Sequence, residues 1–395
     1  MDAFRAKIRG TVILAPLTRG GNLPFRRLCA DFGAQVTVSE MAYARYLTQR
    51  RPELALLVKA PNEACFGVQI ATNNIEEGAA AGLLAMNAGA SFLDLNCGCP
   101  IFEATRRGLG SALLRKPSKL SRLVAGIAEG VPLPFSVKIR SGLKEDEPNA
   151  KEVVKVLQEA GAAMITLHPR SQQQRYSKAA DWDLVAEIAH DPATTVPIIG
   201  NGDVLCHWEA ERHILKRGVS AVMVGRGALI KPWLFKECLD GKEWFPSPEE
   251  RVEVYHRLSL YMKEHFGVDA KGKKKAFYFL PWHFSFLARW RPTKRELFED
   301  HPYPLLQDGR HVEAVLTESE GPLSQLPPLE RLLRVIHDDA HLAISEALWD
   351  SETAEEAVAA LTALAEARAA EWEAAERDGS KDARAPAQYK SEGWG

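Results

Sequence analysis

The stretch VPIIGNGDVLCHWEAERHILKRGVSAVMVGRGALIKPW, residues 196–233, contains the pattern that decides the fold of this chain. It holds two short apolar runs, VPIIGN (196–201) and SAVMVG (220–225), each ending in a polar residue or a glycine. A longer amphipathic segment lies between them, as expected for a helix that connects two strands. The stretch therefore predicts parallel strands joined by helical crossovers.

The same pattern recurs upstream of this stretch. Six earlier runs have the same character: TVILAPL (11–17), QVTVSE (35–40), CFGVQI (65–70), SFLDLN (91–96), PFSVKI (134–139) and AMITLH (163–168). Eight such units within about 230 residues predict an α/β fold, a (β/α)8 TIM barrel. A doubly wound sheet is the alternative, but the GxGxxG turn typical of its first strand is absent after the first run.

Length and composition indicate a globular protein of two domains. The chain has 395 residues, 46% hydrophobic and 26% charged, which excludes collagen-like, low-complexity and wholly disordered proteins. The charges of 50 basic and 52 acidic residues nearly cancel, so the net charge of the chain does not by itself point to a nucleic-acid partner. Six cysteines are too few for a disulfide scaffold, and MDAFRAKIRG at the start has no apolar signal core. Because no run of about 18 apolar residues occurs, we expect a cytoplasmic protein without a membrane span.

A second region begins near GKEWFPSPEER (241–251). Ser247, Pro248 and Glu250 match the N-cap, first helical position and capping-box partner of a new helix. No strand-like run follows, so this region is expected to be helical. The expected organisation is a catalytic barrel over residues 1–243, a helical domain over 244–350 and a tail over 351–395.

The tail is expected to start as a helix and end as a frayed segment. Residues 351–377 are rich in alanine and glutamate, which predicts a solvated helix. The final residues, KDARAPAQYKSEGWG (381–395), lack a regular apolar pattern and predict a frayed end.

Polar side chains lie at the carboxyl ends of the predicted strands, where TIM barrels place their catalytic groups. The residues at these ends are Pro16, Glu40, Gln69, Asn96, Lys138, His168, Asn201, Gly225 and Arg226. Because side chains alternate between the two faces of a strand, Lys138 and Arg140 share one face. We expect these two side chains and His168 to converge over one mouth of the barrel.

The mouth of the predicted barrel suits an anion. The loops after the seventh and eighth runs are NGD (201–203) and GRGALIKPW (225–233), and such loops commonly bind phosphate in TIM barrels. Their glycines would let backbone N–H groups approach a ligand closely. Tight turns alone would also explain each glycine. Two such loops together with Lys138 and His168 favour a phosphorylated cofactor.

The loop after the fourth run, NCGCP (96–100), places Cys99 over the mouth. Cys99 could be a metal ligand, a buried structural thiol, or a reactive acid, base or nucleophile. No second CxxC and no suitable histidine spacing accompany it, so we expect no metal site. The structural and the reactive interpretations both stay open at this point. Cys97, two residues earlier, is expected to face the packing side.

The strongest local charge lies between Lys271 and Arg295, which include eight lysines and arginines and no acidic residue. Aromatic residues are interleaved with these cations, a combination that suits RNA through phosphate contacts and base stacking. We expect many of the aromatics to be core residues, and a solvated basic rim is the alternative. Lys273, Lys274 and Lys275 are the candidates for RNA contact.

Seven segments, taken together and in order, resemble one enzyme family. They are APLTRGGNLPFRRLC (15–29), FGVQI (66–70), LDLNCGCP (93–100), VKIRSG (137–142), LHPRSQQQRYSKAADW (167–182), GNGDV (200–204) and GRGALIKPWLF (225–235). The chain resembles the tRNA-dihydrouridine synthases, which have an FMN-binding barrel and a C-terminal helical domain. GNLPFRRLC (21–29) and QRYSKAADW (174–182) are most similar to the branch called dihydrouridine synthase 3.

The resemblance implies roles for individual residues, carried over by position. Cys99 would be the catalytic proton donor, and Asn96, Arg140 and Arg170 would contact the substrate. The residues around the flavin and its phosphate would be Ala15, Pro16, Leu17, Gln69, Lys138, His168, Asn201, Gly202, Asp203, Gly225 and Arg226. Leu17 replaces a frequent methionine, which is tolerable because the contact is through the backbone. Pro169 replaces a frequent glycine, a change that bears on how Arg170 is presented.

The activity implied by the resemblance is reduction of the C5=C6 bond of uridines in tRNA, with FMN as cofactor and NADPH as reductant. A uridine in folded RNA must leave its stack to reach the mouth of a barrel. Ribosomal RNA and a small pyrimidine-like molecule are alternative substrates, although the latter leaves the basic stretch unused. Two competing hypotheses are a lyase that uses Lys138 as a Schiff base and a catalytically silent RNA-binding protein. We expect a monomer without a protein partner.

Overall fold

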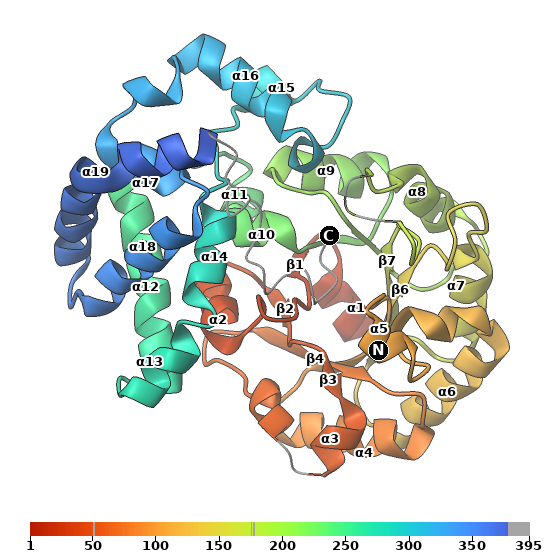
Figure 1. Cartoon of the computed structure of the whole chain (residues 1–395). Helices are drawn as coiled ribbons and strands as arrows, with labels where there is room; N and C mark the ends of the chain where they lie inside the picture. The colour runs from red at the N-terminus through yellow and green to blue at the C-terminus, as the bar shows by residue number, and fades with distance from the viewer. Residues whose placement is uncertain (50–51, 175, 177, 378–395) are drawn as a thin grey trace.

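The computed structural model describes residues 1–49, 52–174, 176 and 178–377 (Figure 1). Within these ranges the strands form one parallel sheet that closes into a barrel, because β1 joins β9 to β2 and β2 also pairs with β4. The strands are β1 (Val12–Leu14), β2 (Val36–Val38), β3 (Ala42–Tyr43), β4 (Cys65–Ala71), β5 (Phe92–Cys97), β6 (Phe135–Arg140), β7 (Met164–His168), β8 (Ile198–Asn201) and β9 (Ala221–Val224). Each of the eight predicted runs contains one strand, so the TIM-barrel prediction is confirmed. The short β3 was not predicted, and it continues β2 along β4.

Helices surround the barrel and form the layer between the sheet and solvent. They are α1 (Asp2–Ile8), α2 (Leu23–Asp31), α3 (Ala44–Thr48), α4 (Ile75–Asn87), α5 (Phe102–Thr105), α6 (Pro117–Gly130), α7 (Ala150–Glu159), α8 (Trp182–His190), α9 (His207–Lys216), α10 (Arg226–Ile230) and α11 (Leu234–Asp240). Two short 3-10 helices, η1 (Pro52–Leu57) and η2 (Gly110–Arg115), lie among them. The doubly wound alternative is excluded because the described strands close on themselves.

Apolar side chains fill the interior of the barrel at its amino end. Phe92 is fully buried there, and Gly67 on the neighbouring β4 makes room for it. A Cβ atom on Gly67 would lie only 2.2 Å from Cζ of Phe92. Phe4 of α1 packs on the same ring at 5.4 Å between centroids, so α1 covers the amino end. The opposite, carboxyl end is left for polar residues.

The described part of the chain after residue 243 contains helices joined by loops and no strand. Its helices are α12 (Pro248–Phe266), α13 (Ala270–Ala276), α14 (Leu280–Leu287), α15 (Arg295–Phe298), α16 (Gly309–Glu320), α17 (Pro328–Arg334), α18 (Asp338–Asp350) and α19 (Ala354–Arg377), with η3 (Leu305–Gln307) and η4 (Leu323–Gln325) between them. Ser247 caps α12 through the backbone N–H of Glu250, and the Glu250 side chain returns the bond. The predicted helix start is therefore confirmed.

The helix predicted within residues 351–377 is confirmed as α19, but the prediction that it is solvated is wrong. One face of α19 is buried, with Leu361, Ala365 and Trp372 each at most 3% exposed. The helix packs against α12 and α17, and its alanines allow close approach of these neighbours. The composition was misleading because alanine suits both a solvated helix and a tightly packed one. The frayed end predicted for 381–395 lies outside the described residues.

The segment from α15 to η3 returns to the barrel, a contact that the sequence did not indicate. Figure 1 shows α15 and α16 above α9, whereas the other late helices gather on one side of the barrel. Arg212 of α9 donates to the backbone oxygen of Glu299, and the backbone N–H of Leu305 donates to Glu209 at 3.3 Å. The late helical region therefore forms part of the wall around the mouth. Among the described helices, none has the length and apolar character needed to cross a bilayer.

Candidate active site

Two adjoining cavities of about 110 and 90 Å³ lie at the carboxyl end of the barrel. They share Pro16, Lys138, His168 and Tyr176 in their walls. Every candidate residue predicted from the barrel lines one of the two: Ala15, Pro16, Leu17, Gln69, Asn96, Cys99, Lys138, Arg140, His168, Arg170, Asn201, Gly202, Asp203, Gly225 and Arg226. Except for Glu40, the residues at the predicted strand ends therefore form one continuous site. The Glu40 side chain lines neither cavity and instead accepts the backbone N–H of Arg19 at 2.5 Å.

The three lysines predicted to contact RNA lie elsewhere, on α13. Lys274 and Lys275 are exposed, and Lys273 forms an ion pair with Asp350 at 3.2 Å. These lysines line neither cavity. They belong to a separate basic surface, and a role in RNA binding stays a prediction.

Cys99 stands on a loop that is clamped from both sides. Its backbone N–H donates to Oδ1 of Asn96 at 2.8 Å, and its carbonyl accepts bonds from the N–H and the hydroxyl of Ser111, each at 3.0 Å. Gly110 has a φ of 60°, and a Cβ atom there would lie 2.4 Å from the Cys99 carbonyl oxygen. Only glycine therefore permits this clamp. Cys97 is fully buried in the core, on the packing side as expected.

The environment of Cys99 keeps its thiol protonated at neutral pH. Burial raises the pKa of this thiol, and Arg140 and Lys138 offset only part of the effect. A protonated thiol in a cavity wall is suited to donate a proton. In the described ranges, no cluster of three or more His, Cys, Asp or Glu residues is arranged to hold a metal ion.

A chain of hydrogen bonds, which sequence reasoning missed, orients the amide groups beside Cys99. Nδ2 of Asn96 donates to Oε1 of Gln69 at 2.7 Å, and Nε2 of Gln69 donates to Oδ2 of Asp94 at 2.8 Å. The other Asp94 oxygen accepts the hydroxyl of Ser136 at 2.5 Å. Asp94 accepts at the end of this chain, so it decides which way both amides face. Asn96, predicted to contact the substrate, has its oxygen engaged by the Cys99 loop.

Two further cations in the wall differ in how they face the cavity. Burial, together with Arg140, lowers the pKa of Lys138 to about 8. Arg140 donates to the carbonyls of Gly98 at 2.9 Å and Ser171 at 2.7 Å. Much of its hydrogen-bonding capacity thus supports the Cys99 loop, whereas Lys138 can meet an anion.

His168 is held as a neutral imidazole. Burial lowers its pKa well below the usual value, and the nearby cations, Lys138 first among them, lower it further. Nη1 of Arg170 lies 3.0 Å from Nε2 of His168. Because a guanidinium can only donate, Nε2 must accept, and the ring proton therefore sits on Nδ1.

Asp203 holds two arginines and does not itself suit a phosphate. One of its oxygens accepts Nη2 of Arg226 at 2.8 Å, and the other accepts Nη2 of Arg170. Since a carboxylate repels a phosphate, Asp203 acts by fixing Arg226, which is the better anion ligand. Arg170 is fully buried and also donates to the carbonyl of Lys178. Arg170 therefore lines the cavity from a buried position beside His168, and its predicted contact with the substrate stays a prediction.

Two residues of this wall were not predicted. Gln307 of η3 donates to Oδ1 of Asp203 at 2.7 Å, so the late helical region contributes to the site. Tyr176 lies over the arginines, with Cζ of Arg226 4.2 Å from its ring centroid. Tyr176 belongs to the segment QRYSKAADW (174–182), which resembles the family. This resemblance was the signal from which Tyr176 could have been predicted as a site residue.

The residues present fit a phosphorylated flavin such as FMN. Gly202 has a φ of 135°, and a Cβ atom on Gly227 would lie 2.0 Å from the carbonyl oxygen of Val204. These two glycines leave a cradle in which backbone N–H groups and Arg226 can meet a phosphate. Gln69 and Lys138 supply the donors that a flavin ring would need on the other side. The chemistry of the donor set, cationic and glycine-lined at one end and amide-rich at the other, matches such a group.

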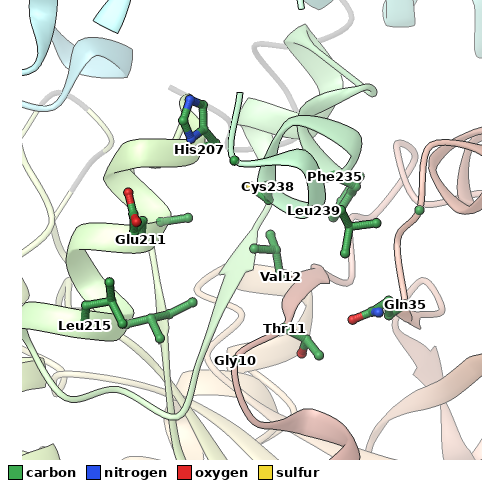
Figure 2. Close-up of a pocket in the computed structure, with 14 residues that line it drawn as sticks. Gly10, Thr11, Val12, Gln35, His207, Glu211, Leu215, Phe235, Cys238 and Leu239 are labelled. Atoms are coloured by element: carbon green, nitrogen blue, oxygen red, sulfur yellow. The ribbon is translucent and has the colours of Figure 1, made fainter. Parts of the chain in front are cut away.

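A third cavity, of about 360 Å³, lies at the amino end of β1 between α9 and α11 (Figure 2). Its walls are mainly apolar, with Val12, Leu215 and Leu239 labelled in Figure 2. The candidate residues named above do not line it. Although it is larger than the cavities at the mouth, it offers no comparable set of donors and lies on the wrong side of the barrel for the strand-end residues.

The fold and site together define a TIM barrel with an anion cradle and a protonated thiol at its mouth. Residues 13–302 match the family described as "Dihydrouridine synthase (Dus)", and the chain belongs to this family.

Curated relatives are similar over most of this chain. A human protein named "tRNA-dihydrouridine(47) synthase [NAD(P)(+)]-like" is 39% identical over 331 residues, which cover 80% of this chain and 49% of that protein. The "tRNA-dihydrouridine(47) synthase [NAD(P)(+)]" of Candida albicans is 41% identical over 310 residues, covering 72% and 50%. The chain thus spans about half the length of the curated relatives it matches. A solved 6-hydroxypseudooxynicotine amine oxidase from Pseudomonas geniculata overlaps with a TM-score of 0.47 at 12% identity, over 63% of this chain and 50% of that one.

Proposed function

We propose that this protein is an FMN-dependent tRNA-dihydrouridine synthase, which reduces the C5=C6 bond of a uridine in tRNA to give 5,6-dihydrouridine. NADPH is the proposed reductant. The observation that carries the proposal is the protonated Cys99 thiol held beside a cationic, glycine-lined cradle. Because the curated relatives are named for position 47 and the printed names include NAD(P)(+), uridine 47 is the proposed target.

Bound in the cradle, FMN would supply the hydride that C6 of the uracil ring receives. Cys99 supplies the proton that C5 receives, so the two additions together saturate the double bond. The thiol is protonated before the reaction because burial raises its pKa. Lys138 and Arg140 favour the thiolate left behind, which regains a proton from solvent.

The other wall residues orient groups and do not exchange protons in this proposal. Arg226, fixed by Asp203, would hold the phosphate, with Ala15, Pro16, Leu17 and the glycine loops forming the rest of the cradle. Neutral His168 keeps its Nδ1 proton and can act as a hydrogen-bond donor. The clamp on the Cys99 loop fixes the distance between the Cys99 thiol and the uracil base. Holding reacting groups at a fixed distance in this way raises the reaction rate by a large factor.

Each domain has its own proposed role. Residues 1–243 carry catalysis, residues 244–350 bind RNA with Lys273, Lys274 and Lys275 as phosphate contacts, and residues 351–395 are the C-terminal tail. The protein is proposed to act as a monomer. All six cysteines are free, which suits the reducing cytoplasm.

The test is to purify the protein, identify its cofactor and assay it on RNA. We expect the visible absorption of a flavin, FMN on extraction, and NADPH-dependent formation of dihydrouridine in tRNA transcribed without modifications. Mapping dihydrouridine in RNA from a strain that lacks the gene locates the natural target. Loss of dihydrouridine from ribosomal RNA alone would assign the alternative substrate. Absence of flavin after gentle purification and FMN reconstitution would refute the proposal.

A further inference from the structure

A surface groove of about 620 Å³ lies beside the active site, on the outer side of the Cys99 loop. Its lining combines two tyrosines, two arginines and several exposed amide side chains. None of the roles proposed so far uses this groove. Its residues come from β3 and α3, from the end of β4 and the start of α4 with the loop between them, and from the loop that precedes η2.

The groove and the Cys99 loop share a wall. Tyr43 and Leu109 line the groove, and both pack in one small apolar cluster with Cys99 and Ile101. Leu109 is followed directly by Gly110 and Ser111, which clamp the Cys99 carbonyl. A ligand seated in the groove would therefore rest on the same structure that positions the thiol.

The polar groups of the groove are held in place before any ligand arrives. Nη1 of Arg107 donates to the hydroxyl of Tyr46 at 3.0 Å. The backbone carbonyl of Arg107 accepts a hydrogen bond from Nδ2 of Asn73 at 3.0 Å. The rings of Tyr43 and Tyr46 meet edge to face at 5.5 Å between centroids. Such preorganisation lowers the entropy lost when a ligand binds.

The charge around the groove is modestly positive. Arg45 and Arg107 line it and Arg106 lies beside them, while Glu77 and Glu103 are the acidic groups. Glu103 forms ion pairs with both Arg106 and Arg107. Because these pairs are on the surface, they contribute little stability, and another anion can replace Glu103 at low cost. A phosphate can take the place of Glu103 without leaving a buried charge unpaired.

Phe102, the first residue of α5, is an exposed aromatic residue on the loop that carries Cys99. Its side chain is 77% exposed, and it follows Ile101, which lines the active-site cavity. Phe102 is three positions after Cys99 in the chain, so the two Cα atoms lie within about 11 Å of each other even if the chain were extended. Cζ of Arg106 lies 5.9 Å from the centroid of the Phe102 ring, and most of the side chain remains exposed. An exposed aromatic ring at this distance from the proton donor is placed to stack a base next to the one being reduced.

We propose that Phe102 and this groove form a subsite for the RNA nucleotides that flank the target uridine. The flanking base stacks on Phe102, and its backbone phosphate meets Arg45 and Arg107. Stacking together with phosphate contacts is the usual way in which proteins hold unpaired RNA. The subsite rests on the proposed function, and it places an RNA contact on the barrel, separate from the lysines of α13.

The test compares tRNA affinity and its salt dependence between matched variants of the full-length protein. Phe102→Ala should weaken binding of unmodified tRNA about tenfold, within the range that loss of one stacked base gives, and Phe102→Tyr should restore it. Phe245→Ala is the matched control, since Phe245 is 42% exposed but lies between α11 and α12. Arg45→Ala should reduce the slope of log affinity against log salt by about 0.7, and Arg310→Ala on α16 is its control.

Unchanged tRNA affinity in both Phe102→Ala and Arg45→Ala would overturn the inference. A higher KM for NADPH with unchanged tRNA affinity would assign the groove to the dinucleotide and also overturn it. In both cases the wild-type protein still forms dihydrouridine, so the proposed function survives. If the wild-type protein neither binds nor reduces tRNA, the proposed function fails, and this inference fails with it.

Discussion

Replacing Asp94 tests whether a single buried carboxylate sets the orientation of the amides beside Cys99. Asp94→Ala removes the acceptor for Nε2 of Gln69, which frees the Gln69 amide to turn. Once it turns, its Oε1 no longer faces Nδ2 of Asn96, and the hold of Asn96 on the Cys99 backbone weakens. Asp94→Asn differs, because its oxygen can still face Gln69 while its NH₂ faces Ser136. The Ser136 hydroxyl can then accept that NH₂ and donate to the Leu93 carbonyl, which lies 3.4 Å away.

The expected magnitudes follow from this difference. Asp94→Ala leaves Nε2 of Gln69 buried without a partner, which costs about 1–3 kcal/mol of folding stability. Asp94→Asn keeps both bonds in neutral form and should cost about 1 kcal/mol. A loosened Cys99 loop should slow the RNA half-reaction by about tenfold to a hundredfold in Asp94→Ala, because small displacements of a reacting group have effects of this size.

The assay has two parts, performed on variants that retain FMN. Urea denaturation gives the change in stability, and stopped-flow reoxidation of the reduced flavin by tRNA gives the rate. Asp94→Ala should be much slower than Asp94→Asn. If flavin reoxidation in Asp94→Asn is as slow as in Asp94→Ala, the negative charge of Asp94 is what the reaction needs, for instance to act on Lys138. Orientation of the amides is then not the role of Asp94, and this prediction is refuted.

Three further predictions concern the cofactor and the RNA surface. FMN affinity of the apoprotein should fall as the pH rises above about 8, because Lys138 then loses its charge, and Lys138→Met should abolish this dependence in a fluorescence titration. Gln307→Ala should weaken FMN binding severalfold by releasing Asp203, while Gln307→Glu, which places a second carboxylate there, should weaken it more. Replacing Lys273, Lys274 and Lys275 together by alanine should reduce the salt slope of RNA binding by up to about two units. An unchanged slope would mean that these lysines form a solvated rim.

Much of the fold and site could be predicted because the deciding interactions are local in the sequence. Apolar runs with the length typical of strands indicate the barrel, and the polar residues that end them have to meet at one mouth. Asp94 could have been found the same way, since it shares a strand face with Asn96 and pairs in register with Gln69. It is easily overlooked because the run SFLDLN resembles a packing strand with one polar end.

The interactions that could not be predicted join residues far apart in the chain. Gln307 and Asp203 are separated by 104 positions, and no local pattern indicates their hydrogen bond. Arg170 follows a strand as a catalytic residue would, but its partner Asp203 turns it into a buried support. The buried face of α19 is likewise decided by α12 and α17, and not by its own alanine-rich composition.

The central claim, that Cys99 donates the proton, is tested most directly by a single-turnover measurement. The enzyme is loaded with FMN, reduced with NADPH in the absence of oxygen, and mixed with unmodified tRNA while flavin reoxidation is followed. If Cys99 is the donor, Cys99→Ala slows reoxidation by about 10²–10⁴-fold and Cys97→Ala costs far less, since only Cys99 faces the mouth. Reoxidation of Cys99→Ala at the wild-type rate, or equal losses in the two variants, would contradict this assignment.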